Sequence, residues 1–185
     1  MNQIAQARRK LRFEKGAMTF ANKEFTFALN PKTDLPLKYK ESLPMASKQL
    51  VEEYMLLANT IVAEFLESKI GPKTLLRVHD DIPDKKKVAL AEYFQRLGLD
   101  AINLTDSASL NSTVAYQLSQ IKDLDQRASI GDAINRKLLG GVSAAYYNCI
   151  GVQGVDQTRH YGLNFDRYTH FTSPIRRQGQ RARAC

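Results

Sequence analysis

The sequence contains no tryptophan, and its 185 residues include only two cysteines and three histidines. Cys149 lies in an apolar stretch and Cys185 is the last residue, so the two cannot provide a disulfide framework. This scarcity favours a reducing compartment. It also argues against a zinc site, which needs more ligands than two distant cysteines and three scattered histidines supply.

An apolar run long enough to cross a membrane is missing as well. The basic N-terminus is not followed by the apolar segment that characterises a secretory signal. The sequence therefore predicts a protein with no membrane partner, located in the cytoplasm or also in the nucleus.

Basic side chains, in contrast, are abundant and unevenly placed. Lys and Arg number 27 against 19 Asp and Glu, which gives a formal net charge of +8 and a pI near 9.5. Residues 8–15 (RRKLRFEK) hold five basic side chains and one acid, and residues 176–185 (RRQGQRARAC) hold four arginines and no acid. The charge favours a polyanionic partner, and these two segments are the candidates for contacts with phosphate groups.

The first 45 residues predict a helix, a strand and a loop. Residues 2–14 have the apolar spacing of a basic helix, which Gly16 ends. A strand over 24–29 follows a hairpin-like turn signal at Asn22–Lys23. Residues 31–45 contain three prolines and many charges, and they predict a surface loop.

The clearest helix covers residues 47–69, with Ser47 as its expected N-cap. Its apolar positions are too many for one narrow face, so we expect the helix to be buried over much of its circumference. Gly71–Pro72 ends the helix, and a short buried strand over 74–78 follows.

The middle of the chain predicts further helices. Asp84 is placed to cap a helix that ends at Gly98. Residues 103–127 are polar and moderately helical, and residues 129–139 have the pattern of a helix that ends at two glycines. For residues 142–150 the apolar period fits a helix or a strand equally well. Together these elements predict a helix-rich α+β fold with short strands.

The stretch HYGLNFDRYTHFTSPIRR, which begins at residue 160, runs from an alternating aromatic pattern into a basic end. The alternation predicts one or two strands within 161–172. Ser173 and Pro174 are favoured at an N-cap and a first helical position, which places Arg176 and Arg177 in the first turn of a helix. Cations there oppose the helix dipole unless an anion binds, and phosphate is the natural anion.

This stretch resembles the signature of the RNB exoribonucleases, namely ribonuclease II and ribonuclease R of bacteria and the Dis3-like nucleases of eukaryotes. Three further segments are similar to the family in order and spacing, and the eukaryotic branch is the most similar. They are LRFEKGAMTF from residue 11, LVEEYMLLANTIVAEFL from residue 50 and LLRVHDDIPDKKKVALAEYFQRLGL from residue 75.

The resemblance implies magnesium-dependent, processive hydrolysis of single-stranded RNA from its 3′ end, with release of nucleoside monophosphates. It assigns contact with the scissile phosphate to Arg176 and contact with a ribose hydroxyl to Glu52. Both roles suit the chemistry of these groups. The remaining expected RNA-binding residues are Arg177, Ser173, Tyr168 and His170. For Tyr168 and the nearby Phe171 a place in the core, and for His170 a structural hydrogen bond, are the competing interpretations.

The family's magnesium ligands come from an aspartate-rich loop that precedes the first matching segment, and this sequence contains no such loop. The acidic residues within 79–84 (HDDIPD) match a different part of the family, where we expect them to form a turn and a helix cap. Magnesium is therefore expected for the family, whereas its ligands are not present in this chain.

The sequence thus predicts a partial RNB domain over 1–177 and a basic tail over 178–185 that departs from the family pattern. Two functions remain open at this point. The chain is either part of an exoribonuclease that is inactive alone, or a non-catalytic RNA-binding relative. Single-stranded RNA and the RNA-decay machinery are the expected partners.

Overall fold

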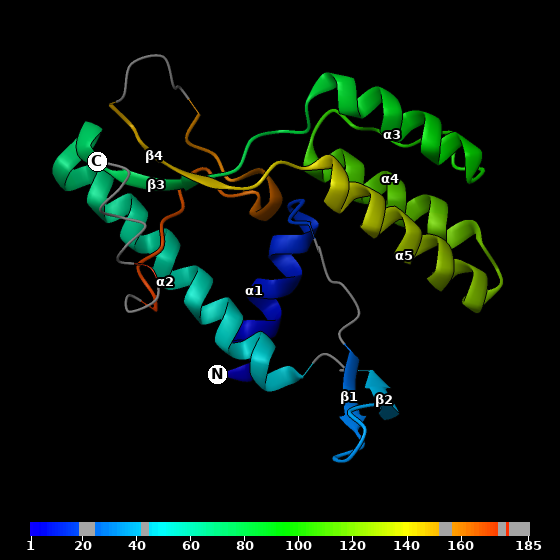
Figure 1. Ribbon diagram of the computed structural model, residues 1–185. Helices are drawn as coiled ribbons and strands as arrows, with labels where there is room; N and C mark the ends of the chain where they lie inside the picture. The colour runs from blue at the N-terminus through cyan, green and yellow to red at the C-terminus, as the bar shows by residue number, and fades with distance from the viewer. Residues whose placement is uncertain (19–24, 42–44, 152–156, 174–176, 178–185) are drawn as a thin grey trace.

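The computed structural model describes residues 1–18, 25–41, 45–151, 157–173 and 177. It confirms a helix-rich α+β fold with short antiparallel strands (Figure 1). In chain order the elements are α1 (Asn2–Glu14), β1 (Phe25–Leu29), β2 (Pro36–Glu41), α2 (Ala46–Ile70), the 3-10 helix η1 (Gly71–Lys73), β3 (Leu75–Val78), α3 (Asp84–Arg96), α4 (Ser107–Gln120), α5 (Leu124–Gly141), β4 (Tyr146–Cys149) and the 3-10 helix η2 (Tyr161–Leu163).

Helix α2 is the longest element, and its bounds confirm the helix predicted over 47–69. Two details of that prediction were wrong. Met45 occupies the N-cap position without a side-chain hydrogen bond, so Ser47 does not cap the helix. Burial is confined to one stripe of α2, because α1 and residues 157–173 cover only that side; Ile61 and Phe65 are more than half exposed.

Strands β3 and β4 form an antiparallel pair, in which Leu75 lies opposite Cys149 and Val78 opposite Tyr146. The strand predicted over 74–78 is confirmed, and residues 146–149 are resolved in favour of a strand. The chain between these strands forms α3, α4 and α5, which lie together on one side of the molecule (Figure 1). We refer to these three helices as the helical layer.

Aspartate side chains cap the N-termini of two of the three helices in this layer. The Asp106 carboxylate accepts hydrogen bonds from the backbone N–H groups of Ala108 and Ser109, and Asp123 does the same at the start of α5. Asp84 does not cap α3 as predicted: it is the first helical residue, after Pro83, and its carboxylate pairs with Lys87 at 3.1 Å.

The larger hydrophobic core is built mainly by the helical layer, and Met18 and Tyr161 enter it from other parts of the chain. Its buried residues are Met18, Ile82, Leu90, Phe94, Leu99, Leu110, Ile134, Leu138 and Tyr161. A smaller cluster of Ala63, Leu76 and Val78 joins α2 to the β3–β4 pair. Burial of apolar surface therefore stabilises the helical layer more than it stabilises the contact between α2 and the strands.

The surface loop predicted over 31–45 was wrong in part, because residues 36–41 form β2, which pairs with β1 as a hairpin. Pro36 sits at the first position of the strand, where a missing N–H is tolerated. The turn lies at Asn30, whose side chain accepts a hydrogen bond from the Lys32 N–H. The turn predicted at Asn22–Lys23 lies outside the described residues.

The strands predicted within 161–172 do not form. Residues 161–163 are a turn of 3-10 helix, and Asn164 after it is left-handed, with φ of 54°. Side-chain and isolated backbone hydrogen bonds to α2 and β3 replace a strand ladder here. Ser173 has φ of 57° and therefore lacks the extended backbone of an N-cap. The helix predicted after it falls on residues outside the described part.

Candidate nucleic-acid interface

A single buried side chain, Asn59 of α2, holds the end of the segment 157–173. The Asn59 amide donates to the Tyr168 hydroxyl at 3.1 Å. Its carbonyl oxygen accepts from the backbone N–H groups of Phe171 and Thr172 at 3.0 and 2.9 Å. Asn59 is fully buried, so these bonds form away from water and each contributes to fixing the backbone that leads into Ser173.

Next to Asn59, aromatic rings from two parts of the chain form a cluster. It consists of Tyr147, His160, Phe165, Tyr168 and His170, which we call the aromatic cluster. Ring centroids lie 5.4 to 5.9 Å apart around Tyr168 and 5.6 Å apart between Tyr147 and His170. The Tyr147 hydroxyl is 2.6 Å from His170 Nδ1. Such edge and stacked contacts stabilise the arrangement beyond its buried area.

For Tyr168 and His170 the structure supports the structural interpretation of each residue. Tyr168 is 4% exposed, which fits a core residue, and His170 makes a structural hydrogen bond to Tyr147. Phe171, which the same reasoning placed in the core, is 52% exposed, so that interpretation was wrong.

Two histidines at the base of the cluster are held neutral. Burial lowers the pKa of His160 to about 3, and the neighbouring His79 adds to this effect. Burial also lowers the pKa of His79. The His79 Nδ1 accepts from the Gly162 N–H, which requires Nε2 to carry the proton that it donates to the Ser143 carbonyl. Both rings accept a backbone N–H, His79 from Gly162 and His160 from Leu163, and so contribute to the structure of this segment.

Cationic side chains surround the aromatic cluster. The Arg77 guanidinium lies 4.7 Å from the centre of the Tyr147 ring, and Arg177 donates to the Thr172 carbonyl at 3.3 Å. Burial raises the pKa of Tyr168, and Arg177 acts in the opposite direction. Arg176, the residue assigned to the scissile phosphate, lies outside the described residues.

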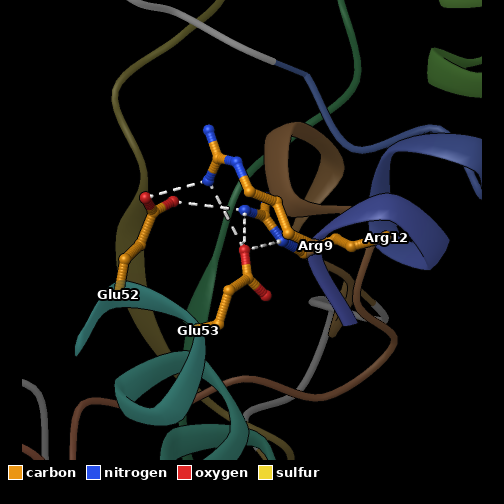
Figure 2. Close-up of polar contacts among 4 residues, drawn as sticks. All are labelled: Arg9, Arg12, Glu52 and Glu53. Carbon is orange, nitrogen blue, oxygen red and sulfur yellow. Dashed lines mark hydrogen bonds and ion pairs between the residues drawn. The ribbon is translucent and has the colours of Figure 1, made fainter. Parts of the chain in front are cut away.

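Glu52 and Glu53, in the first half of α2, face two arginines of α1 (Figure 2). Arg12 donates to Glu53 Oε1 at 2.6 and 3.2 Å and to Glu52 Oε1 at 3.1 Å. Arg9 donates to Glu52 Oε2 at 3.0 Å. The Glu53 and Arg12 side chains are 2% and 7% exposed, whereas Glu52 is 42% exposed. Glu53 is thus a buried structural partner, and Glu52 keeps access to solvent.

The structure therefore does not gather all predicted site residues in one place. Tyr168, His170 and Arg177 come together around Asn59. Glu52 precedes Asn59 by seven residues, which is about 10 Å along a helix axis. Sequence reasoning missed Asn59, although an asparagine inside the apolar stripe of α2 is a signal for a buried polar contact.

No three His, Cys, Asp or Glu side chains in the described part of the chain are placed to hold a metal ion. Asp80 accepts from the Tyr146 hydroxyl at 3.0 Å, and Asp84 pairs with Lys87. Glu52 and Glu53 of α2 are paired with arginines. These carboxylates therefore do not fit the magnesium ions expected for the family, and no chemical step is assigned to a metal here.

In this architecture the signature segment, whose described part is residues 160–173, is held against the long helix α2. The family model of the RNB domain matches residues 1–178, and the chain belongs to this family.

Two relatives illustrate the match. DIS3-like exonuclease 2 of Xenopus tropicalis is 33% identical over 181 residues, which are 94% of this chain and 20% of that protein. The human exosome complex exonuclease RRP44 is 32% identical over 182 residues, which are 96% of this chain and 18% of that protein. The chain thus spans about a fifth of the length of the curated relatives it matches.

Solved structures share the fold. RNase R of Mycoplasma genitalium in complex with ribose-methylated single-stranded RNA has a TM-score of 0.73 at 22% identity, over 94% of this chain and 25% of that chain. Yeast Ssd1, described as a pseudonuclease, has a TM-score of 0.60 at 28% identity, over 74% of this chain and 16% of that chain. In the described residues, no helix is long and apolar enough to span a membrane.

Proposed function

We propose that this chain is part of a 3′-to-5′ exoribonuclease that hydrolyses single-stranded RNA to nucleoside monophosphates, and that it is inactive alone. The observation that carries the proposal is the set of hydrogen bonds that Asn59 makes with Tyr168, Phe171 and Thr172, which we call the Asn59 clamp and which fixes the backbone immediately before Ser173. Inactivity rests on the missing aspartate-rich loop, because two-metal hydrolysis needs converging carboxylates.

Each candidate residue has a proposed role. Arg176 contacts the scissile phosphate, and Arg177 with Ser173 binds the neighbouring phosphate. Tyr168 and His170 support these contacts from inside the protein, because Tyr168 is buried. Glu52 accepts a hydrogen bond from a ribose 2′-hydroxyl; its carboxylate has about four acceptor sites, so the two arginine bonds leave room for another donor.

We also propose the domain bounds, the partner and the location of the protein. Residues 1–177 form the RNB part, and residues 178–185 are a basic tail outside it. The RNA-decay machinery is the proposed partner and the cytoplasm, or also the nucleus, the proposed location, since the relatives include an exosome exonuclease.

The ribose contact gives the sharpest test. Fluorescence anisotropy with oligo(A) RNA and oligo(dA) of equal length should show that Glu52→Gln reduces the preference for RNA, because DNA lacks the 2′-hydroxyl. Arg177→Gln should weaken both ligands, because both carry phosphates. Glu64→Gln, which removes the same charge at an exposed position further along α2, is the control. An unchanged RNA preference in Glu52→Gln would remove the proposed role of Glu52.

Activity is tested with poly(A) and magnesium. Residues 1–185 alone should release no nucleoside monophosphates, whereas a longer protein with the family's aspartate-rich loop and its continuation after SPIRR should release them. In that longer protein Arg176→Ala should lower turnover more than RNA binding, because its contact strengthens as charge develops. Release by the chain alone, after exclusion of a contaminating nuclease, would contradict the proposal.

A second candidate is a non-catalytic RNA-binding protein. The similarity to a pseudonuclease favours it, because that fold exists without nuclease activity. The longer protein separates the two candidates: RNA binding without product release would support the second.

A further inference from the structure

A cavity of about 220 Å³ opens between the start of α3 and the end of α5. These helix ends lie at the side of the helical layer that faces β3 and β4 (Figure 1). The lining residues are Lys86, Ala89, Leu90, Arg136, Lys137, Gly140 and Gly141. The cavity is separate from the aromatic cluster, and its lining shares no residue with it.

The cavity lining contains three cationic side chains and no carboxylate. Lys85 and Lys87 belong to the same turn of α3 as Lys86, and the Asp84 carboxylate neutralises Lys87. The Lys137 ammonium lies 5.0 Å from the centre of the Tyr93 ring, a contact that holds it over α3. The lining therefore presents a concentrated positive charge, which is the ordinary requirement for binding a phosphate group.

Two glycines shape the α5 side of the cavity. A Cβ at Gly141 would lie 3.1 Å from Leu90 Cδ1, so the two helices approach closely there. A Cβ at Gly140 would have no heavy atom within 4 Å. The wall at Gly140 is therefore bare backbone beside open space, and an added side chain at this position can be accommodated without a clash.

From these observations we infer that the cavity binds a backbone phosphate of single-stranded RNA, as a second anchor remote from the SPIRR segment. This inference rests on the proposed function. The volume is below the roughly 300 to 1,000 Å³ of pockets for drug-sized ligands, so it suits a phosphate with part of its ribose. Protein interfaces centre on aromatic and large apolar anchors, whereas the exposed side chains in this lining are Lys86, Arg136, Lys137 and the small Ala89.

A charge swap at Gly140 tests the site without removing any native contact. Gly140→Glu places a carboxylate at the cavity, and Gly140→Gln places a neutral side chain of the same shape there. Anisotropy with oligo(A) should show weaker binding for Gly140→Glu than for Gly140→Gln. Equal affinities in the two variants, with equal melting temperatures, would overturn the inference.

The salt dependence supplies a second measurement. The double variant Lys86→Gln, Arg136→Gln should flatten the log–log salt slope by ~0.7 for each RNA phosphate that the protein no longer neutralises. The control is Lys122→Gln, an exposed lysine just before the opposite end of α5, which should leave the slope unchanged. A double variant that matches this control would also overturn the inference.

Two further probes separate RNA from other anions. Inorganic phosphate should shift the backbone amide signals of Gly140 and Gly141 in NMR spectra, and oligo(A) should shift them more strongly. If phosphate shifts them while oligo(A) binds nowhere on the chain, the RNA ligand and the proposed function both fail. If oligo(A) binds but leaves these amides unshifted, the inference alone fails. Poly-glutamate that displaces oligo(A) equally well would show a general polyanion surface and would also overturn it.

Discussion

The helical layer and the contact between α2 and the β3–β4 pair are stabilised by different interactions. Most of the larger hydrophobic core lies in the helical layer, with fully buried Phe94 and Leu110. The α2 side has a small apolar cluster, and its buried stripe contains Glu53 and Asn59. Tyr161 places the start of the signature segment in the larger core. The end of the segment, from Tyr168 to Thr172, is held by Asn59 through directional bonds, which fix a backbone position more narrowly than apolar packing does.

The largest expected effect comes from breaking the buried ion pair on the α2 side. Arg12→Ala leaves Glu53 buried with Arg9 as its nearest cation at 3.5 Å, and should cost about 3 to 5 kcal/mol of unfolding free energy. Urea denaturation measures this. Replacing both Arg12 and Glu53 by methionine should cost less, because no charge then remains buried. If the double variant is as unstable as Arg12→Ala, the instability does not come from an unpaired buried charge.

Asn59→Ala sharpens the comparison between directional and apolar contacts. Loss of its three hydrogen bonds should cost about 2 to 3 kcal/mol, because two partly buried backbone N–H groups and the buried Tyr168 hydroxyl lose their partner. Leu110→Ala in the helical layer should cost a similar amount, about 2 to 5 kcal/mol.

The two variants should nevertheless differ in RNA binding, measured by anisotropy at a temperature where both are folded. Asn59→Ala should bind oligo(A) more weakly, because the backbone before Ser173 is released. Leu110→Ala should bind like the unmodified chain. Equal affinities would show that the Asn59 clamp does not position RNA-binding groups.

Acid should weaken the α2 side through its histidines. The folded pKa of His160 is about 3 and that of His79 is lowered, both below the unfolded value near 6.5. The stabilisation from His160 is therefore complete above pH 6.5 and is lost as the pH falls toward 3, and that from His79 decreases in the same direction. Each contributes up to about 1.4 kcal/mol per pH unit. Urea unfolding between pH 7 and 5 should have a shallower pH dependence in His160→Gln; an identical one would contradict this.

The smallest effect is expected in the β1–β2 hairpin. Phe27 and Tyr39 lie opposite each other and are 56% and 72% exposed, so neither is part of a core. Phe27→Ser should change the unfolding free energy by less than about 0.5 kcal/mol. Phe94→Ser in the helical layer is the matched contrast and should strongly destabilise the chain. A large effect at Phe27 would show that the hairpin packs against another part of the protein in solution.

Sequence reasoning predicted the elements better than their surroundings. Periodicity placed α1, β1, α2 and β3 well, because local spacing decides these elements. It failed for residues 161–172, although their side chains alternate as in a strand. The backbone there is held by hydrogen bonds with the Asn59 side chain and not by a strand ladder. Burial of α2 was overestimated, since burial depends on which neighbours cover a helix and not on its own composition.

The candidate site was predicted only in its local part. Tyr168, His170 and Arg177 are close in sequence and remain close in space. Asn59 and Tyr147 come from distant parts of the chain, and one sequence carries no information on such pairings. For the same reason the arginine partners of Glu52 could not be predicted.

The pairing of β3 with β4 has a consequence for the order of folding. Val78 lies opposite Tyr146, so the 67 residues from 79 to 145 leave the strand pair and return to it. Closing a loop of that length is entropically costly while it is an unfolded chain, and less so once its helices have collapsed. Seven of the nine buried residues of the larger core belong to this loop. The helical layer should therefore fold first, and the strands and the signature segment should follow.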